Sequence, residues 1–217
     1  MRTRHQLTGA SFFLLLIALA APADAVVRRT QSPLLYQRVA VSGYAGYGVP
    51  VGEFSDSRDG FGNHESGALD WNVDLEYFAG RAASIGFSLA NTTYQDKDDA
   101  ELKTHVSTYS GFVRIVVPTA TVVRPYLRLG MGGVQVEFQD PISRVDSEWE
   151  FSFQAGGGFL WLPARWFGIN LQALYYYGDT AESILWEIPP DVDGRLTEVG
   201  FNTQYFAFSA GLSLFFP

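Results

Sequence analysis

The sequence predicts an all-β fold, a closed antiparallel up-and-down barrel of about eight strands, from three observations. Apolar and polar residues alternate in eight separate segments, which is the period of a β-strand. The connections between these segments are alternately short and long, as in a meander. Aromatic residues make up 15% of the chain, and they favour strands.

The first 25 residues have the three-part pattern of a secretory signal peptide. Arg2 and Arg4 are followed by a short apolar run at residues 11–20 and by two overlapping A-x-A cleavage motifs at residues 21–25. The alternative is an uncleaved anchor helix, but the apolar run is shorter than the roughly 20 residues that a span needs. We therefore expect a signal peptide over residues 1–25 and a barrel domain over residues 26–217.

Eight segments of the remaining chain alternate. Between residues 69 and 78, odd positions hold Leu, Trp, Val, Leu and Tyr, whereas even positions hold Asp, Asn, Asp, Glu and Phe. A strand turns successive side chains to opposite faces, so one face of this segment is apolar and the other is mostly acidic or amide. The eight expected strands are at residues 39–48, 69–78, 84–90, 108–117, 124–139, 148–161, 168–177 and 205–216.

The segment at residues 124–139 needs a correction to fit this rule. Leu127, Leu129 and Met131 are odd, whereas the later apolar residues Val134 and Val136 are even. The phase changes at the glycine pair 132–133, and a β-bulge there would restore the register. The alternative is two short strands joined by a Gly-Gly turn.

The connections alternate in length along the chain. Short ones are expected at residues 79–82, 118–123 and 162–165, and longer polar ones at residues 49–67, 95–103, 140–147 and 179–200. In outer-membrane barrels the short turns face the periplasm and the long loops face outside.

The apolar face is predicted to look outward into lipid, which makes the barrel transmembrane. This face carries very large residues in nearly every strand, whereas the opposite face is rich in Gly, Ser and Ala with scattered charges. Many large aromatic residues would overfill a narrow lumen, but they meet no steric limit in lipid. The aromatic residues expected near the membrane interfaces are Trp71, Tyr77, Trp149, Trp161, Trp166, Tyr175, Tyr177 and Phe216. The alternative is a secreted lipocalin-like barrel or sandwich.

The mature chain resembles the small outer-membrane β-barrel proteins of the porin-family and OmpX/opacity type. The segments that carry the resemblance are 43–56 (GYAGYGVPVGEFSD), 124–133 (RPYLRLGMGG), 155–159 (AGGGF) and 205–216 (YFAFSAGLSLFF). It implies location in the outer membrane of a Gram-negative-type envelope. It also implies contact with outer-membrane lipids, and the loops suggest an extracellular partner.

The closing strand resembles the signal that the outer-membrane assembly machinery recognises, with apolar residues at alternate positions and an aromatic end. Leu212, Leu214 and Phe216 match this pattern, whereas Pro217 departs from it because the usual last residue is the aromatic itself.

Four charged residues are expected to face the lumen at one depth near the periplasmic end. Asp74 and Glu76 precede one short turn, Arg114 precedes another, and Arg128 follows it. Unpaired charge in a narrow interior is costly, so we expect a carboxylate–arginine plug that closes the barrel. The alternative is a water-filled lumen with separately solvated charges.

No catalytic, cofactor-binding or metal-binding residues are predicted. His64, Glu65 and Ser66 are consecutive and cannot converge as a triad on one strand face, and His105 lies near another loop. The acidic loops lack the spacing of a calcium site, and the net charge of −8 argues against nucleic acid as a partner. The predicted function is a structural or loop-mediated role without enzymatic activity. A narrow pore and a lipid-modifying enzyme are the alternatives.

Overall fold

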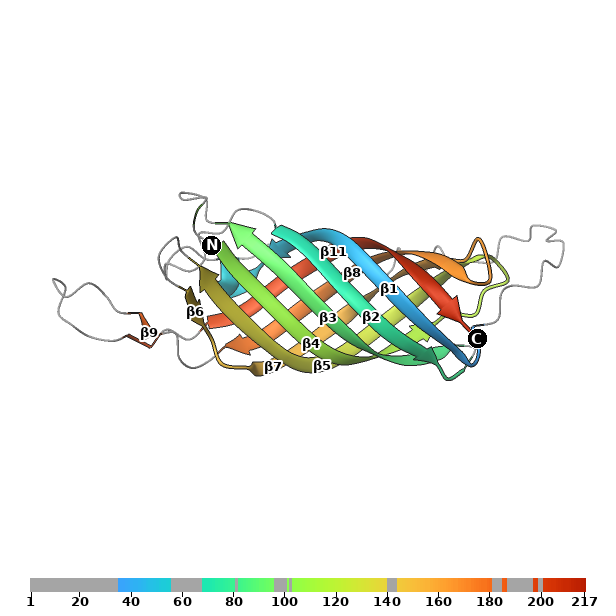
Figure 1. Ribbon diagram of the computed structural model, residues 1–217, viewed down its shortest axis with the longest axis horizontal. Helices are drawn as coiled ribbons and strands as arrows, with labels where there is room; N and C mark the ends of the chain where they lie inside the picture. The colour runs from blue at the N-terminus through green and yellow to red at the C-terminus, as the bar shows by residue number, and fades with distance from the viewer. Residues whose placement is uncertain are drawn as a thin grey trace, which may run out of the picture. The chain divides into compact units, whose positions relative to one another are not determined.

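Eight long antiparallel strands close into a barrel in the computed structural model (Figure 1). Each long strand pairs with the next along the chain, and β1 pairs with β11, so every one has a neighbour on both sides. The eight are β1 (Arg38–Pro50), β2 (Ala68–Phe78), β3 (Ala83–Gln95), β4 (Lys103–Val116), β5 (Val123–Gln139), β7 (Glu150–Trp161), β8 (Phe167–Thr180) and β11 (Phe201–Phe216). The predicted eight-stranded meander is confirmed.

The structure describes residues 35–55, 68–80, 82–95, 101, 103–139, 144–180, 185–186, 197–198 and 201–217. The predicted signal peptide at residues 1–25 lies outside them. No helix among these residues is long and apolar enough to cross a membrane.

The smaller elements all lie in the long connections, and the predicted alternation of connection lengths is confirmed. The 3-10 helix η1 (Gly52–Ser55) follows β1. The short strand β6 (Arg144–Asp146) pairs antiparallel with the last residues of β5. The connection between β8 and β11 contains a separate two-stranded sheet, β9 (Leu185–Trp186) paired with β10 (Thr197–Glu198).

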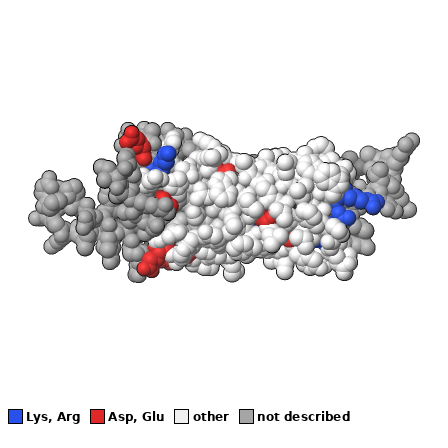
Figure 2. All heavy atoms as spheres, viewed as in Figure 1, with Lys and Arg blue, Asp and Glu red and all other residues white. Residues whose placement is uncertain are grey.

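The apolar face of the wall points outward, as predicted. In β2 every second residue is buried and every other one is exposed, with Leu69 66% exposed and Asp70 fully buried. Figure 2 shows the same division, because the visible wall is almost free of Lys, Arg, Asp and Glu, which gather toward the two ends. A wall of exposed Leu, Val, Phe and Trp would be unfavourable in water and is favourable in lipid.

The bulge predicted at Gly132 and Gly133 is wrong, and so is the alternative of a Gly-Gly turn. The pairing of β5 with β4 and with β7 continues through both glycines without a shift in register. Val134 and Val136 face inward like Tyr126 and Arg128 earlier in β5, whereas Gln135 and Glu137 face outward. Gly132 has a different role: a Cβ there would lie 1.8 Å from the carbonyl oxygen of Tyr109.

The length of β5 explains why the sequence pattern was misleading. The strand has 17 residues, more than the roughly 9–11 that cross a membrane. Its loop end therefore extends past the apolar wall, where the outer face meets water and the inner face packs a core. The apolar side changes there from outside to inside, although each residue keeps its orientation.

Two layers of apolar side chains fill the barrel interior near its ends. The loop-end layer consists of Phe54, Ala68, Tyr94, Val106, Val134, Val136, Leu174, Tyr176, Tyr205 and Ala207. The turn-end layer consists of Leu35, Ala40, Phe78, Val116, Tyr126, Leu160, Leu162 and Phe215. Several Phe and Tyr residues therefore also lie inside the barrel, where they fill the lumen near both ends.

Candidate functional site in the barrel lumen

The structure brings the four predicted lumen residues together. Asp74 and Glu76 lie on β2, Arg114 on β4 and Arg128 on β5, and all four side chains are 0–1% exposed. Arg114 and Arg128 are register partners, so two positive charges lie directly opposite each other. Such a pair is unfavourable on neighbouring strands unless anions compensate it.

The arginines reach the carboxylates of β2 across β3, whose inward residues here are small. Gly86 is the register partner of both Glu76 and Phe112, and Ser84 that of Arg114. A Cβ at Gly86 would lie 2.5 Å from the Phe112 ring, so a larger residue would displace the aromatic side chain below the guanidinium groups.

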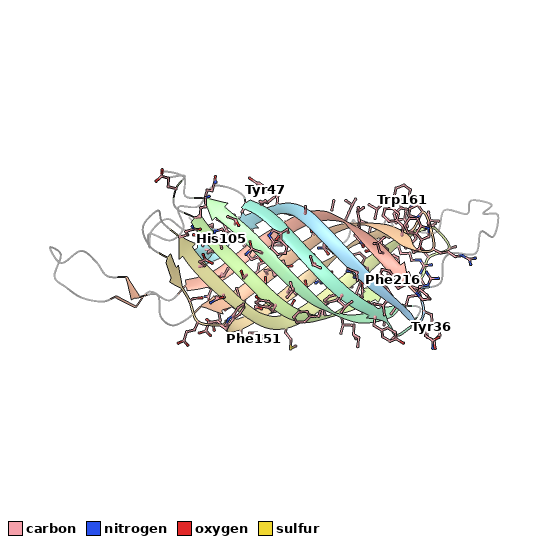
Figure 3. The ribbon with its side chains drawn as sticks, viewed as in Figure 1. Tyr36, Tyr47, His105, Phe151, Trp161 and Phe216 are labelled. Atoms are coloured by element: carbon pink, nitrogen blue, oxygen red, sulfur yellow. The ribbon has the colours of Figure 1, made fainter. Side chains whose placement is uncertain are left out.

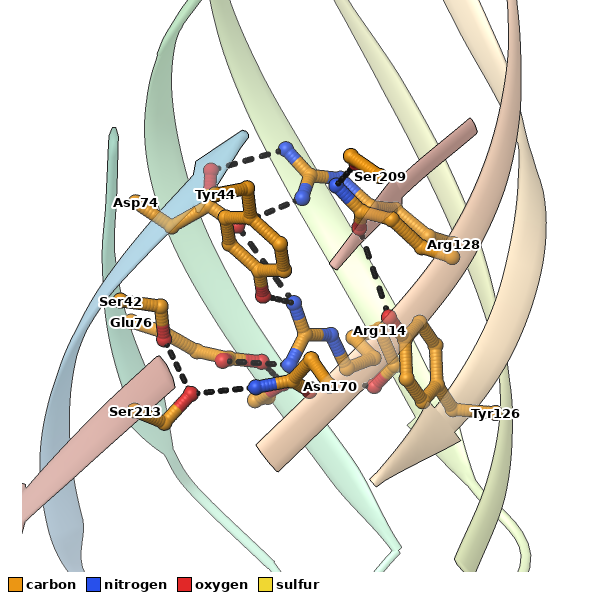
Figure 4. A network of polar contacts seen from close by, with 12 residues as sticks. Ser42, Tyr44, Asp74, Glu76, Arg114, Tyr126, Arg128, Asn170, Ser209 and Ser213 are labelled. Carbon is orange, nitrogen blue, oxygen red and sulfur yellow. Dashed lines mark hydrogen bonds and ion pairs between the residues drawn. The ribbon is translucent and has the colours of Figure 1, made fainter. Parts of the chain in front are cut away.

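Each arginine has one main carboxylate partner (Figure 4). Arg128 binds Asp74 with two hydrogen bonds, Nη1 to Oδ2 at 2.6 Å and Nη2 to Oδ1 at 3.2 Å. Arg114 pairs with Glu76 at 3.0 Å, and its Nη2 lies 3.5 Å from the shared Asp74 Oδ2. The bidentate geometry fixes both position and orientation, which a lysine could not do.

Neighbouring polar and aromatic groups hold this network in place. Arg114 Nη2 donates to the Tyr44 hydroxyl at 3.1 Å, and the Ser84 hydroxyl donates to Glu76. The guanidinium of Arg128 lies 3.8 Å from the centroid of the Phe112 ring, and that of Arg114 lies 4.4 Å from the Tyr126 ring. Aromatic faces attract cations most strongly where water is excluded, as here.

The network lies between the two apolar layers rather than at the end of the barrel. Phe78 and Val116, two residues beyond Glu76 and Arg114, already belong to the turn-end layer. The sequence pattern identifies the four charged residues because all of them are at even positions, whose side chains face the lumen. It missed Tyr44, Phe112 and Tyr126, although the same parity would have placed them beside the charges.

Shorter polar contacts join strands on the other side of the lumen. Asn170 donates to Ser213 at 2.6 Å, and Ser42 and Ser213 share a hydrogen bond of 2.5 Å (Figure 4). Gln172 donates to Ser209 at 3.0 Å. These contacts join the neighbouring strands β1, β11 and β8 on the inner face of the barrel.

The other sequence-derived candidates lie on the outer face or outside the described residues. Figure 3 shows Phe216 at the turn end, the same end as Trp161 and Tyr36. Leu212, Leu214 and Phe216 all point outward. Their role as an assembly signal stays a prediction. His105 lies at the loop end, where its ring contacts Thr93 and Gln139. His64, Glu65 and Ser66 fall outside the described residues, and those residues contain no cluster of His, Cys, Asp and Glu that could hold a metal.

Comparison with known proteins identifies the fold. No protein-family model matches the sequence, and no curated protein sequence matches it. Neisserial surface protein A (NspA) superposes with a TM-score of 0.59 at 12% identity, over 82% of this chain and 97% of that one. The outer membrane protein OprG from Pseudomonas aeruginosa gives 0.54 at 10% identity, over 84% and 98%. The chain has the fold of the eight-stranded outer-membrane β-barrel proteins. At such low identity the likeness concerns the fold alone.

Proposed function

We propose that this barrel is a non-enzymatic outer-membrane protein with a lumen closed to solutes, acting as a structural element or through its loops. The supporting observation is that side chains occupy the barrel interior at three successive levels along its axis. An apolar layer lies at each end, and the buried network of Asp74, Glu76, Arg114 and Arg128 lies between them.

Each level opposes the passage of ions and small solutes. A hydrated ion would lose its water among the apolar side chains, which costs far more than a protein contact returns. At the middle level it would have to displace groups that already compensate each other's charge. The four charged side chains thus act as the plug that the sequence suggests, with the apolar layers as additional barriers.

The long connections are the part of the chain available to an extracellular partner. In this meander the strand ends that they join all lie at one end of the barrel, and the strand ends joined by the short turns lie at the other. In an outer membrane the loop end faces outside. We therefore assign any partner contact to the loops, with membrane lipids as partners of the apolar wall.

Conductance in planar bilayers tests the closed lumen. The wild-type protein, shown to be folded by a mobility shift on boiling, should give no steady conductance steps. The Arg114→Ala variant should stay closed as well, because it leaves both apolar layers in place. Steady steps from the wild type would contradict the proposal and favour a narrow pore.

We further propose that residues 1–25 are removed on export and that Leu212, Leu214 and Phe216 carry the assembly signal. Phe216→Ala should lower the amount of barrel assembled in cells while leaving refolding into detergent micelles unchanged. Phe206→Ala is the matched control, because Phe206 also points outward on β11 but lies far from the end of the strand. Equal assembly of the two variants would contradict the assigned signal.

A further inference from the structure

The charged residues that the structure describes at the turn end of the barrel are arginines. Arg38 begins β1 there, and Arg165 lies in the turn between β7 and β8. The short connections at residues 79–82, 117–122 and 162–166 contain two arginines and no Asp or Glu, whereas every long connection at the opposite end contains several acidic residues. On the face drawn in Figure 2, basic side chains lie at the turn end and acidic side chains gather at the loop end. The turns therefore form a basic end of the barrel without an acidic side chain of their own.

Arg38 and Arg165 adjoin across the end of β11. This strand pairs with β1 on one side and with β8 on the other, so the two arginines flank it. Arg38 Nη1 donates a hydrogen bond to the carbonyl oxygen of Arg165, which uses one of the five N–H donors of the guanidinium. Arg165 itself is exposed. Like charges on neighbouring elements destabilise each other, and an anion that contacts both guanidinium groups would remove this repulsion.

The same end of the barrel carries exposed aromatic side chains. Trp166 directly follows Arg165 and is 63% exposed. Tyr36, Trp161 and Phe216 are also exposed at this end (Figure 3). Trp and Tyr at the ends of membrane-spanning segments lie at the level of the lipid headgroups. The arginines beside them are therefore at the level of the lipid phosphates.

The lipid-facing wall begins directly beside these arginines. The carbonyl oxygen of Trp166 accepts a hydrogen bond from the Phe215 amide at 2.9 Å, which ties the turn to the end of β11. Three residues along β1 from Arg38, Val41 is the register partner of Leu214 on β11, and both side chains point outward. A phospholipid with its phosphate at the arginines would therefore lay its acyl chains on this apolar surface.

We propose that Arg38, Arg165 and Trp166 form a binding site, which we call the turn-end lipid site, for an anionic phospholipid such as phosphatidylglycerol. Guanidinium groups bind phosphate oxygens through paired hydrogen bonds. An anionic lipid fits better than zwitterionic phosphatidylethanolamine, because two arginines repel its ammonium group. The inference rests on the proposed function, in which the turn end faces the periplasm, and the inner leaflet of an outer membrane consists of phospholipids. It names the lipid that the barrel binds there.

Lipid retention measured by native mass spectrometry tests the proposal. The wild type is refolded in detergent micelles with equal amounts of phosphatidylglycerol and phosphatidylethanolamine, and the lipids that stay bound are identified by mass. Phosphatidylglycerol should be enriched, with each arginine contributing roughly fivefold to the ratio of the two bound lipids. Arg38→Gln and Arg165→Gln should each lower the ratio by that factor, and the double variant should retain both lipids equally. Lys103→Gln, which removes a positive charge at the loop end of β4, should leave the ratio unchanged.

The lipid ratio separates the turn-end lipid site from folding and from the proposed function. All variants should show the mobility shift on boiling, because both arginines reach the surface and glutamine there does not disturb the barrel. Both ends of the barrel are accessible in micelles, so the ratio depends neither on orientation in a membrane nor on a closed lumen. An equal ratio for the wild type and the double variant would overturn the proposal. Displacement of bound phosphatidylglycerol by an equal concentration of inorganic phosphate would also overturn it, because the site would then hold a phosphate ion rather than a lipid.

Discussion

The wall of the barrel at membrane depth and its extension at the loop end distribute apolar residues in opposite ways. At membrane depth, outward residues such as Leu129 and Leu171 are more than half exposed, and the inside holds charged and amide groups. At the loop end, Val134 and Val136 are buried inside, and Gln135 and Glu137 face out. One strand, β5, passes through both regions without a change of register. The solvent outside, rather than the backbone, decides which face is apolar.

The largest effect should come from breaking the polar interior at membrane depth. Arg114→Ala leaves Glu76 buried without its cation, which should lower the free energy of unfolding by about 3–5 kcal/mol. Adding Glu76→Ala should recover part of the loss, because the unpaired carboxylate is removed too. Urea unfolding of the wild type, both single variants and the double variant measures the coupling energy. Coupling near zero would mean that these charges are separately solvated.

A charge on the outer face should separate the two regions directly. Leu171→Arg puts a guanidinium among lipid chains and should cost about 2–4 kcal/mol of unfolding free energy. Gln135→Arg makes the same change on the outer face of the loop end, where water solvates it, and should cost little. The comparison is made by urea titration in lipid vesicles. Equal costs would show that the apolar wall extends as far as Gln135.

Truncating a valine should cost more stability on the inner face of the barrel than on its lipid-facing outer face. Val136→Ala leaves a cavity in the loop-end layer and should cost about 1–3 kcal/mol. Val113→Ala removes the same atoms from the lipid-facing side of β4, where lipid chains can fill the space, so its cost should be smaller. Thermal unfolding of both variants in the same micelles ranks them. A larger loss for Val113→Ala would contradict the inward packing of Val136.

The smallest effect expected is a gain in stability at an outward glycine. No atom lies within 4 Å of a Cβ built at Gly111, so Gly111→Val adds an apolar, strand-favouring side chain to the lipid face. It should stabilise the barrel by about 0.5–1 kcal/mol. Gly86→Val is the inward counterpart and should destabilise it, because its side chain would meet the Phe112 ring. If Gly111→Val is also destabilising, Gly111 has a contact partner in the membrane.

The strands and their orientation could be predicted because alternation is a local property of the sequence. The residues from 69 to 78 show it without help from any distant contact, and parity then places Asp74, Glu76, Arg114 and Arg128 in one lumen. The pairing of Arg128 with Asp74 and of Arg114 with Glu76 could not be predicted. It depends on how far the strands are staggered around the barrel, which connection lengths do not fix.

The errors arose where one strand passes through two environments. The change of apolar parity at Gly132 and Gly133 predicts a β-bulge, but it marks the level where lipid gives way to water. The capping of the lumen by Phe54 was also missed. Its segment has no strand alternation, and its burial depends on the tyrosines of β3 and β11, which are distant in sequence.

The pairing of β1 with β11 has a consequence for biogenesis. The register runs without interruption from Val39 opposite Phe216 to Pro50 opposite Tyr205. The first strand of the barrel therefore has no partner on this edge until the last strand is present. The cylinder cannot close until β11 has been made and has reached β1. Until then the outer edge of β1 offers unpaired backbone groups to any other chain nearby. Truncation within β11 should therefore leave part of β1 unpaired and divert the polypeptide to proteolysis.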